Sequence, residues 1–151
     1  MGPARRAFLR HCSLLALGFA AAPPTSAHAQ GARRTLLVVG DSLSAEYGLP
    51  RGAGWVALME KRIAAEKLPV KVVNASISGD TTSGGRSRLP ALLKVHRPHT
   101  VLIELGGNDA LRGLPLALTK DNLTAMARAA KAAGAKVLIA GMAVPPNYGR
   151  Q

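Results

Sequence analysis

Four short apolar runs, separated by longer polar or amphipathic segments, dominate the chain after residue 34. They cover residues 35–40, 70–75, 100–105 and 136–141. The runs are of strand length and are apolar without alternation, which is typical of strands covered on both faces in a parallel sheet.

Helices are predicted between these strands. Residues 54–67 repeat large apolar side chains at helical spacing and end before Pro69. Pro90 can open a helix that runs to Pro98, after a polar, glycine-rich loop over 76–85. A third helix is predicted over 119–133, with Gly134 as its C-cap, and its buried side chains are predicted to be Leu123, Met126, Ala127 and Ala130.

Regular alternation of strand and helix favours right-handed crossovers and one α/β domain. We expect a three-layer sandwich around a parallel sheet over residues 30–151. The sequence contains no repeat and no low-complexity segment that would suggest a second domain.

Residues 1–29 have the pattern of a signal peptide. Arg5, Arg6 and Arg10 precede the apolar run 13–22, and "AHA" at 27–29 resembles a cleavage signal before Gln30. The run is too short to span a bilayer. Residues 5–10 fit both an ordinary Sec n-region and a twin-arginine signal that lacks the usual Ser or Thr. We therefore expect export by one of these machineries to the periplasm or medium, without a stable membrane anchor.

The net charge of +12 invites a nucleic-acid or membrane-surface interpretation. The basic residues after the leader are, however, mostly scattered singly, with pairs at 33–34 and 61–62, and aromatic residues make up only 3%. A solvated basic surface therefore fits better, and no nucleic-acid partner is expected. The single cysteine, Cys12, lies in the leader, so no disulfide or thiolate site is predicted.

Polar or glycine-rich loops follow the first three strands, and they carry Ser42, Gly79 and Asn108. Parallel strands end at one edge, where α/β proteins bind ligands, so these residues should meet there. Ser42 is presented to a carbonyl group, the Gly79 backbone permits close approach, and the Asn108 amide can donate to developing negative charge. Taken singly, each residue also fits a structural role: an N-cap serine, a turn glycine and a turn asparagine.

Together these blocks resemble the SGNH, or GDSL, hydrolase family. "GDSLS" matches its first block, "SGDTTSGG" its second and "GGND" its third. The likeness runs from Thr35 to Gly149 and is greatest to the thioesterase I, lysophospholipase L1 and arylesterase branch. The resemblance implies Ser42 as nucleophile, with Gly79 and Asn108 forming the oxyanion hole. It also implies a small acyl ester or thioester substrate, hydrolysed through an acyl-serine, and no metal or cofactor.

One position departs from this branch. Glu46 stands where glycine is expected, beside Tyr47, so both residues are candidates for controlling access of the acyl group.

The family's fourth block, an Asp-x-x-His that supplies the base, is absent from this sequence. His96 and His99 are predicted to lie at the edge of the sheet opposite Ser42. We therefore expect a C-terminally truncated member that lacks the last strand and closing helix, with little or no activity. The alternative is a non-catalytic acyl-binding remnant.

Overall fold

The structure is a computed structural model, and it describes residues 34–143. The predicted signal peptide lies outside these residues, so nothing in the structure bears on it. Strands and helices alternate along the chain as β1 (Arg34–Gly40), α1 (Trp55–Ala65), β2 (Val70–Asn74), α2 (Thr82–His96), β3 (Thr100–Glu104), α3 (Gly107–Leu111), α4 (Leu116–Ala132) and β4 (Lys136–Ile139).

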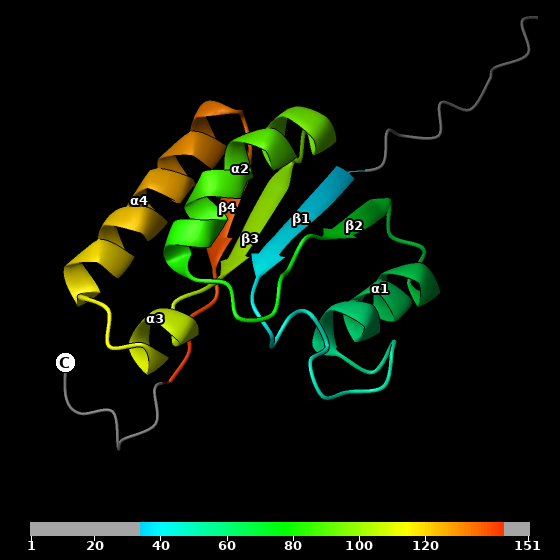
Figure 1. Cartoon of the computed structure of the whole chain (residues 1–151). Coiled ribbons are helices and arrows are strands. Elements are labelled where there is room, and N and C mark those ends of the chain that lie inside the picture. The colour runs from blue at the N-terminus through cyan, green and yellow to red at the C-terminus, as the bar shows by residue number, and fades with distance from the viewer. Residues whose placement is uncertain (1–33, 144–151) are drawn as a thin grey trace, which may run out of the picture.

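The strands form one parallel sheet in the order β2-β1-β3-β4, as the apolar runs predicted (Figure 1). β1 lies between β2 and β3, and its residues Leu37, Val38 and Val39 are fully buried. All strands run in one direction, so the loops after β1, β2 and β3 leave the sheet at the same edge.

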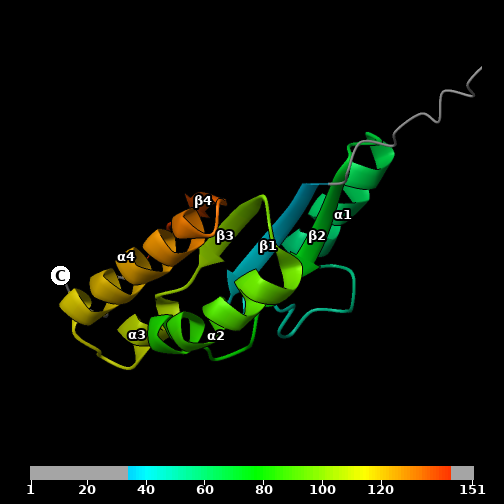
Figure 2. The ribbon, with the colours of Figure 1, turned by 90° about the horizontal axis from the view of Figure 1, so that it is seen from above.

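Helices cover both faces of the sheet, which confirms the α/β class. α2 and α4 lie on one face and α1 lies on the other, beside β2 (Figure 2). The main core fills the space beneath α2 and α4, and it consists of Leu37, Val39, Leu89, Leu93, Val101, Ile103, Leu105, Met126, Ala130 and Ala135.

The prediction for α2 was wrong at its start. The helix begins at Thr82, eight residues before Pro90, so Pro90 lies inside it. Thr81 caps the helix by accepting a hydrogen bond from the Gly84 N–H at 3.3 Å. A side chain at Gly85 would collide with Leu105, so glycine lets the helix pack closely on the core. This packing outweighs the poor helix propensity of glycine and proline.

Other boundaries shift by one to three residues, and one element was missed. The sequence predicted a loop at "GGND", whereas the five-residue helix α3 begins within this segment. In α4, Asn122 is buried, whereas Leu123 and Ala127 are only half-buried, contrary to the predicted pattern. Gly134 has φ +83°, as its predicted capping role requires.

Among the described residues, β4 pairs with no strand other than β3. Leu138 and Ile139 on this strand are about half exposed, at 54% and 52%. Within the described residues, β4 thus presents an apolar strand edge. In residues 34–143 no helix has the length and apolar character needed to cross a membrane.

Candidate active site

Ser42 lies in a tight turn directly after β1. The Asp41 side chain shapes this turn, because its Oδ1 accepts a hydrogen bond from the Leu43 N–H at 3.0 Å. Backbone bonds from Ala45 to Asp41 at 2.9 Å and from Tyr47 to Ser42 at 3.2 Å complete it. Ser42 is half-buried, and its hydroxyl has no hydrogen-bond partner within the part of the chain that the structure describes. It is thus held by its backbone while its side chain stays uncommitted.

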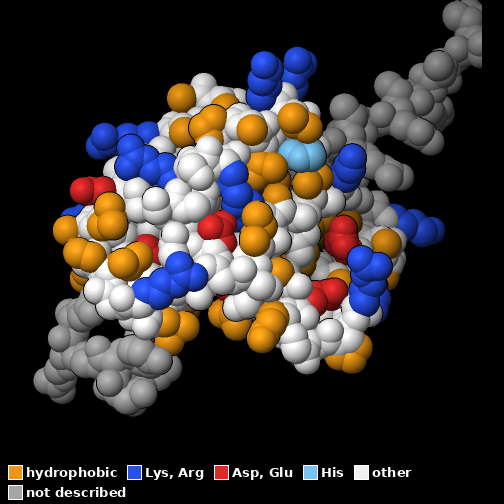
Figure 3. Space-filling model, in the orientation of Figure 1, with side chains coloured by type: hydrophobic (Ala, Val, Ile, Leu, Met, Phe, Trp, Pro, Cys, Tyr) orange, Lys and Arg blue, Asp and Glu red, His pale blue; other side chains and the backbone are white. Residues whose placement is uncertain are grey.

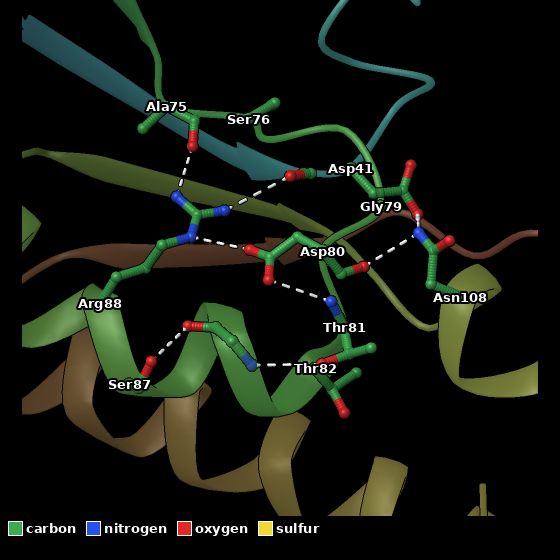
Figure 4. Close-up of polar contacts among 12 residues, drawn as sticks. Asp41, Ala75, Ser76, Gly79, Asp80, Thr81, Thr82, Ser87, Arg88 and Asn108 are labelled. Atoms are coloured by element: carbon green, nitrogen blue, oxygen red, sulfur yellow. Dashed lines mark hydrogen bonds and ion pairs between the residues drawn. The ribbon is translucent and has the colours of Figure 1, made fainter. Parts of the chain in front are cut away.

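Asn108 joins the loops that follow the first three strands. From α3, its side-chain amide donates to Asp41 Oδ2 at 3.1 Å and to the Asp80 carbonyl at 2.9 Å (Figure 4). Asp41 precedes Ser42 and Asp80 follows Gly79, so the three candidate residues lie on segments joined by this one amide. The predicted convergence at the edge of the sheet is therefore present.

Gly79 forms the outer part of this arrangement. Its φ of +79° lies in the left-handed region that favours glycine, and the Asp80 N–H closes the turn on the Ile77 carbonyl at 3.1 Å. The Gly79 carbonyl accepts a hydrogen bond from Arg112 Nη2 at 2.7 Å. The conformation of this loop thus depends on glycine at position 79 and on a side chain from the α3 end.

Arg88 on α2 supports the loops from within. Its guanidinium donates to Asp80 Oδ2 at 2.8 Å, to the Ala75 carbonyl and to the Gly40 carbonyl at 3.4 Å (Figure 4). Both Arg88 and Asp80 are largely buried, so this ion pair is screened less than one at the surface. Sequence reasoning missed Arg88, because its partners lie up to 48 residues away in the chain.

A second buried network fixes α3 against α2 and α4. The Asp109 carboxylate accepts hydrogen bonds from the Thr82 N–H at 2.9 Å, Thr82 Oγ1 at 2.5 Å and Thr119 Oγ1 at 3.3 Å. Asn122 Nδ2 donates to Thr82 Oγ1 at 3.1 Å. Because Asp109 follows Asn108 directly, this network holds the helix that carries the candidate oxyanion donor.

Glu104 at the end of β3 is a buried carboxyl group. Its Oε2 accepts a hydrogen bond from Ser44 Oγ at 2.7 Å, whereas its Oε1 has no partner among the described residues. Burial raises the pKa of Glu104, and the nearby negative charge of Asp41 adds to this effect, although the Ser44 hydrogen bond opposes it. The neutral form of Glu104 is thus more stable, relative to the charged form, than it is for an exposed glutamate.

Glu104→Gln is expected to make stability less dependent on pH. Because the pKa of Glu104 is higher in the folded chain, the folded state holds this proton longer as pH rises. The free energy of unfolding therefore falls as the pH rises from the ordinary pKa of a glutamate to the higher pKa of Glu104 in the folded chain. Urea unfolding should show that the stability of the variant relative to that of the wild type is greater at pH 7 than at pH 4. Glu60→Gln on exposed α1 is the control, and equal pH profiles for all three proteins would contradict the prediction.

The carboxylate of Glu46 folds back onto its own loop. It accepts hydrogen bonds from the Gly52 N–H at 3.0 Å and the Gly54 N–H at 2.9 Å, just before α1. These bonds lower the pKa of Glu46, with Gly52 contributing most. Its backbone has φ +60°, which agrees with the sequence-based expectation of glycine there. Tyr47 next to it is 77% exposed.

Of the described histidines, His96 ends α2 and His99 precedes β3, so both lie at the edge of the sheet opposite Ser42. His99 exchanges hydrogen bonds with Thr35 at the start of the strand: its N–H donates to the Thr35 carbonyl at 2.9 Å, and its Nδ1 accepts from the Thr35 N–H at 3.3 Å. Ser42 follows the other end, so His99 cannot act as its base. No cluster of three metal-ligating side chains occurs within residues 34–143.

The chain is similar to several known proteins in sequence and structure. The chain is 59% identical over 120 residues to the esterase TesA of Pseudomonas aeruginosa. It is 49% identical over 117 residues to the thioesterase 1/protease 1/lysophospholipase L1 of Escherichia coli. The crystal structure of TesA superposes with a TM-score of 0.75 and covers 77% of this chain.

The matched region is only part of these relatives. It covers 80% of this chain but 60% of the Pseudomonas esterase, and 78% of this chain but 55% of the Escherichia coli enzyme. The profile of the GDSL-like lipase/acylhydrolase family matches residues 38–151, which include Ser42, Gly79 and Asn108. The chain therefore belongs to the GDSL-like lipase/acylhydrolase family.

Proposed function

We propose that this chain carries the nucleophile and oxyanion hole of a hydrolase acting on acyl esters or thioesters. The observation that carries the proposal is the Asn108 amide, which ties the Ser42 turn to the Gly79 loop. The names of the relatives support it, since they include an esterase, an arylesterase and a thioesterase.

In the proposed reaction, Ser42 Oγ attacks the acyl carbonyl carbon and its proton passes to a base. The carbonyl oxygen becomes an oxyanion that accepts hydrogen bonds from the Ser42 and Gly79 N–H groups and from Asn108. The Asn108 amide would exchange its longer bond, the one to Asp41, for the oxyanion. Collapse expels the alcohol or thiol with a proton, and water then hydrolyses the acyl-serine.

Exposed apolar side chains beside these residues suit an acyl chain. Leu43 and Tyr47 follow β1, Ile77 follows β2 and Leu111 lies in α3, and all are more than half exposed. Hydrophobic side chains are visible along this lower edge of the molecule in Figure 3. We propose that they receive the acyl group, with Tyr47 and Glu46 limiting access from the β1 side.

The proposed chemistry requires a base that accepts the proton of Ser42. The four histidines of the sequence are His11, His28, His96 and His99. His96 ends α2 and His99 bonds to the start of β1, so both lie at the edge of the sheet opposite Ser42. Without a base, the 151-residue chain is expected to turn over esters several powers of ten more slowly than a complete triad.

Chemical rescue tests the proposal directly. Imidazole added to the purified chain should accept the Ser42 proton and restore slow hydrolysis of p-nitrophenyl octanoate. The rate above that of imidazole alone should rise with imidazole concentration and vanish in Ser42→Ala, whereas Ser83→Ala on the exposed side of α2 should retain it. Equal rescued rates for the Ser42→Ala variant and the wild type would refute the role of Ser42 as nucleophile. Rapid Ser42-dependent turnover without imidazole would instead refute the expectation that the chain lacks a base.

The alternative of an acyl-binding remnant uses the same apolar surface. It predicts saturable binding of octanoate that weakens in Asn108→Ala, with no Ser42-dependent hydrolysis at any imidazole concentration.

We also propose that residues 1–29 direct export, on the sequence pattern alone. N-terminal sequencing of the protein recovered from a bacterial periplasm should begin at Gln30, and an intact Met1 there would contradict this proposal.

A further inference from the structure

Gly40, the last residue of β1, lies directly beneath two polar side chains. A Cβ at this position would lie 2.6 Å from Ser44 Oγ, 2.8 Å from Ser44 Cβ and 2.9 Å from Glu104 Oε2, all too close for real atoms. Because Ser44 Cβ is joined directly to the backbone, rotation of the hydroxyl would not relieve this clash. Gly40 is also outside the set of described glycines with positive φ, so its backbone conformation does not require glycine. Glycine is needed here for space, and the Ser44–Glu104 pair occupies that space.

Ser44 is held from both strands that flank β1. Its hydroxyl donates to Glu104 Oε2, at the end of β3, at 2.7 Å. Its carbonyl accepts from Asn74 Nδ2, at the end of β2, also at 2.7 Å. Both Ser44 and Glu104 are buried, and in such surroundings a hydrogen bond is stronger than one in water. The turn that carries Ser42 is thus fixed to the sheet two residues after the candidate nucleophile.

The bond from Ser44 to Glu104 bears on the relative position of two candidate reacting groups. Gly40 and Glu104 are paired in the β1–β3 ladder, so the chain leaves these two strands side by side. Ser42 follows Gly40 by two residues, and Asn108 follows Glu104 by four. A link between Ser44 and Glu104 therefore ties the turn of the nucleophile to the strand that leads to the proposed oxyanion donor.

Stability alone does not account for a carboxyl group at this place. Glu104 Oε1 is buried and has no hydrogen-bond partner among the described residues. A buried, unsatisfied oxygen lowers stability, and burial also raises the pKa of Glu104. Local rules of this kind are broken mostly at functional sites. Ser44 can donate to the charged carboxylate and can donate to or accept from the neutral carboxyl, so the link is available in both forms.

We propose that Glu104 is a positioning residue, which acts through Ser44 to hold Ser42 in place relative to Asn108. It does not touch the substrate in this role. The inference rests on the proposed function, because the rate that it affects is that of the attack by Ser42. A misplaced nucleophile slows the reaction step without weakening substrate binding, and a displacement of about 1 Å can cost about 10²-fold in rate. Loss of the link is therefore expected to lower kcat and to leave KM largely unchanged.

Imidazole-rescued hydrolysis of p-nitrophenyl octanoate by the whole chain is the first test, with rates counted per folded molecule. Glu104→Ala should lower kcat about tenfold and change KM less than about twofold. Ser44→Ala should have the same effect, and the double variant should be no slower than either, because both changes remove one bond. Glu104→Gln keeps an acceptor oxygen for Ser44 and should retain most of the rate. Glu60→Ala, on the exposed side of α1, is the matched control and should retain all of it.

Amide hydrogen exchange tests the link without requiring turnover. The Ala45 and Tyr47 N–H groups close the Ser42 turn by bonding to the Asp41 and Ser42 carbonyls. In Ser44→Ala, both amides should exchange about five- to tenfold faster than in the wild type, whereas amides in α4 should keep their rates. Ser44→Ala is the smaller change, so it serves in both tests even if Glu104→Ala does not fold.

The other outcomes separate this inference from the proposed function. If exchange and kcat both stay at their wild-type values, Glu104 does not hold the turn and the inference is wrong, yet Ser42-dependent hydrolysis still supports the proposed function. If exchange is faster but kcat is unchanged, the contact is only structural and the inference is again wrong. If the effects of the two single variants add, Glu104 does not act through Ser44, which also overturns it. If the wild type shows no Ser42-dependent hydrolysis at any imidazole concentration, the proposed function fails and the positioning role fails with it.

Discussion

Replacing Asp109 with alanine is expected to lower the free energy of unfolding by about 3 kcal/mol. The carboxylate is 1% exposed and accepts three hydrogen bonds from Thr82 and Thr119. Alanine would leave the Thr82 N–H and hydroxyl buried without this partner, and an unsatisfied buried polar group is costly. The loss should appear in urea unfolding followed by circular dichroism.

Asp121→Ala is the matched control, because this aspartate is exposed on α4 and the change in charge is the same. Its effect should stay within about 0.5 kcal/mol. Asp109→Asn keeps the shape and one acceptor oxygen, so it should fall between the two. If Asp109→Ala and Asp121→Ala unfold at the same urea concentration, the network does not hold α3 as described.

The second large effect is expected at Asn108. Asn108→Ala should lower the imidazole-rescued, Ser42-dependent rate by about 10²–10³, the usual cost of losing one oxyanion donor. In the resting structure the amide bonds to Asp41 and to Asp80, so alanine also removes two contacts between loops. Those contacts are worth about 1 kcal/mol each in stability, whereas the expected loss in rate corresponds to about 2.7–4 kcal/mol in the activation barrier.

Measuring stability and rate on the same samples separates the two contributions. The rate per folded molecule should fall even where thermal unfolding shows the variant fully folded. Asn74→Ala is the matched control: this asparagine also bridges to the Ser42 turn, through the Ser44 carbonyl at 2.7 Å, but it lies outside the proposed oxyanion hole. Equal rates for the two variants would show that Asn108 only joins loops.

The edge of the sheet that carries the candidate site could be predicted from patterns along the chain. Continuous apolar runs mark strands covered on both faces, and a parallel sheet brings their C-terminal ends together. Ser42, Gly79 and Asn108 could therefore be located at one edge from local patterns alone. The same rule located His99 at the opposite edge, where it bonds to the start of β1.

The start of α2 could not be predicted this way. Gly84, Gly85 and Pro90 all disfavour a helix when judged locally. The helix forms because the Thr81 cap satisfies its first turn and Gly85 permits close packing against Leu105 and Met126. That packing depends on residues at least twenty positions away from Gly85, which no local pattern contains.

The sequence by itself determined the alternation of strands and helices and the family blocks, because each is a property of residue order. Tertiary structure alone decided which side chains complete the site. Arg88, Asp109, Glu104 and Arg112 lie far along the chain from most of the groups they bind. Their roles follow from burial and distance, which exist only once the loops have been brought together by the sheet.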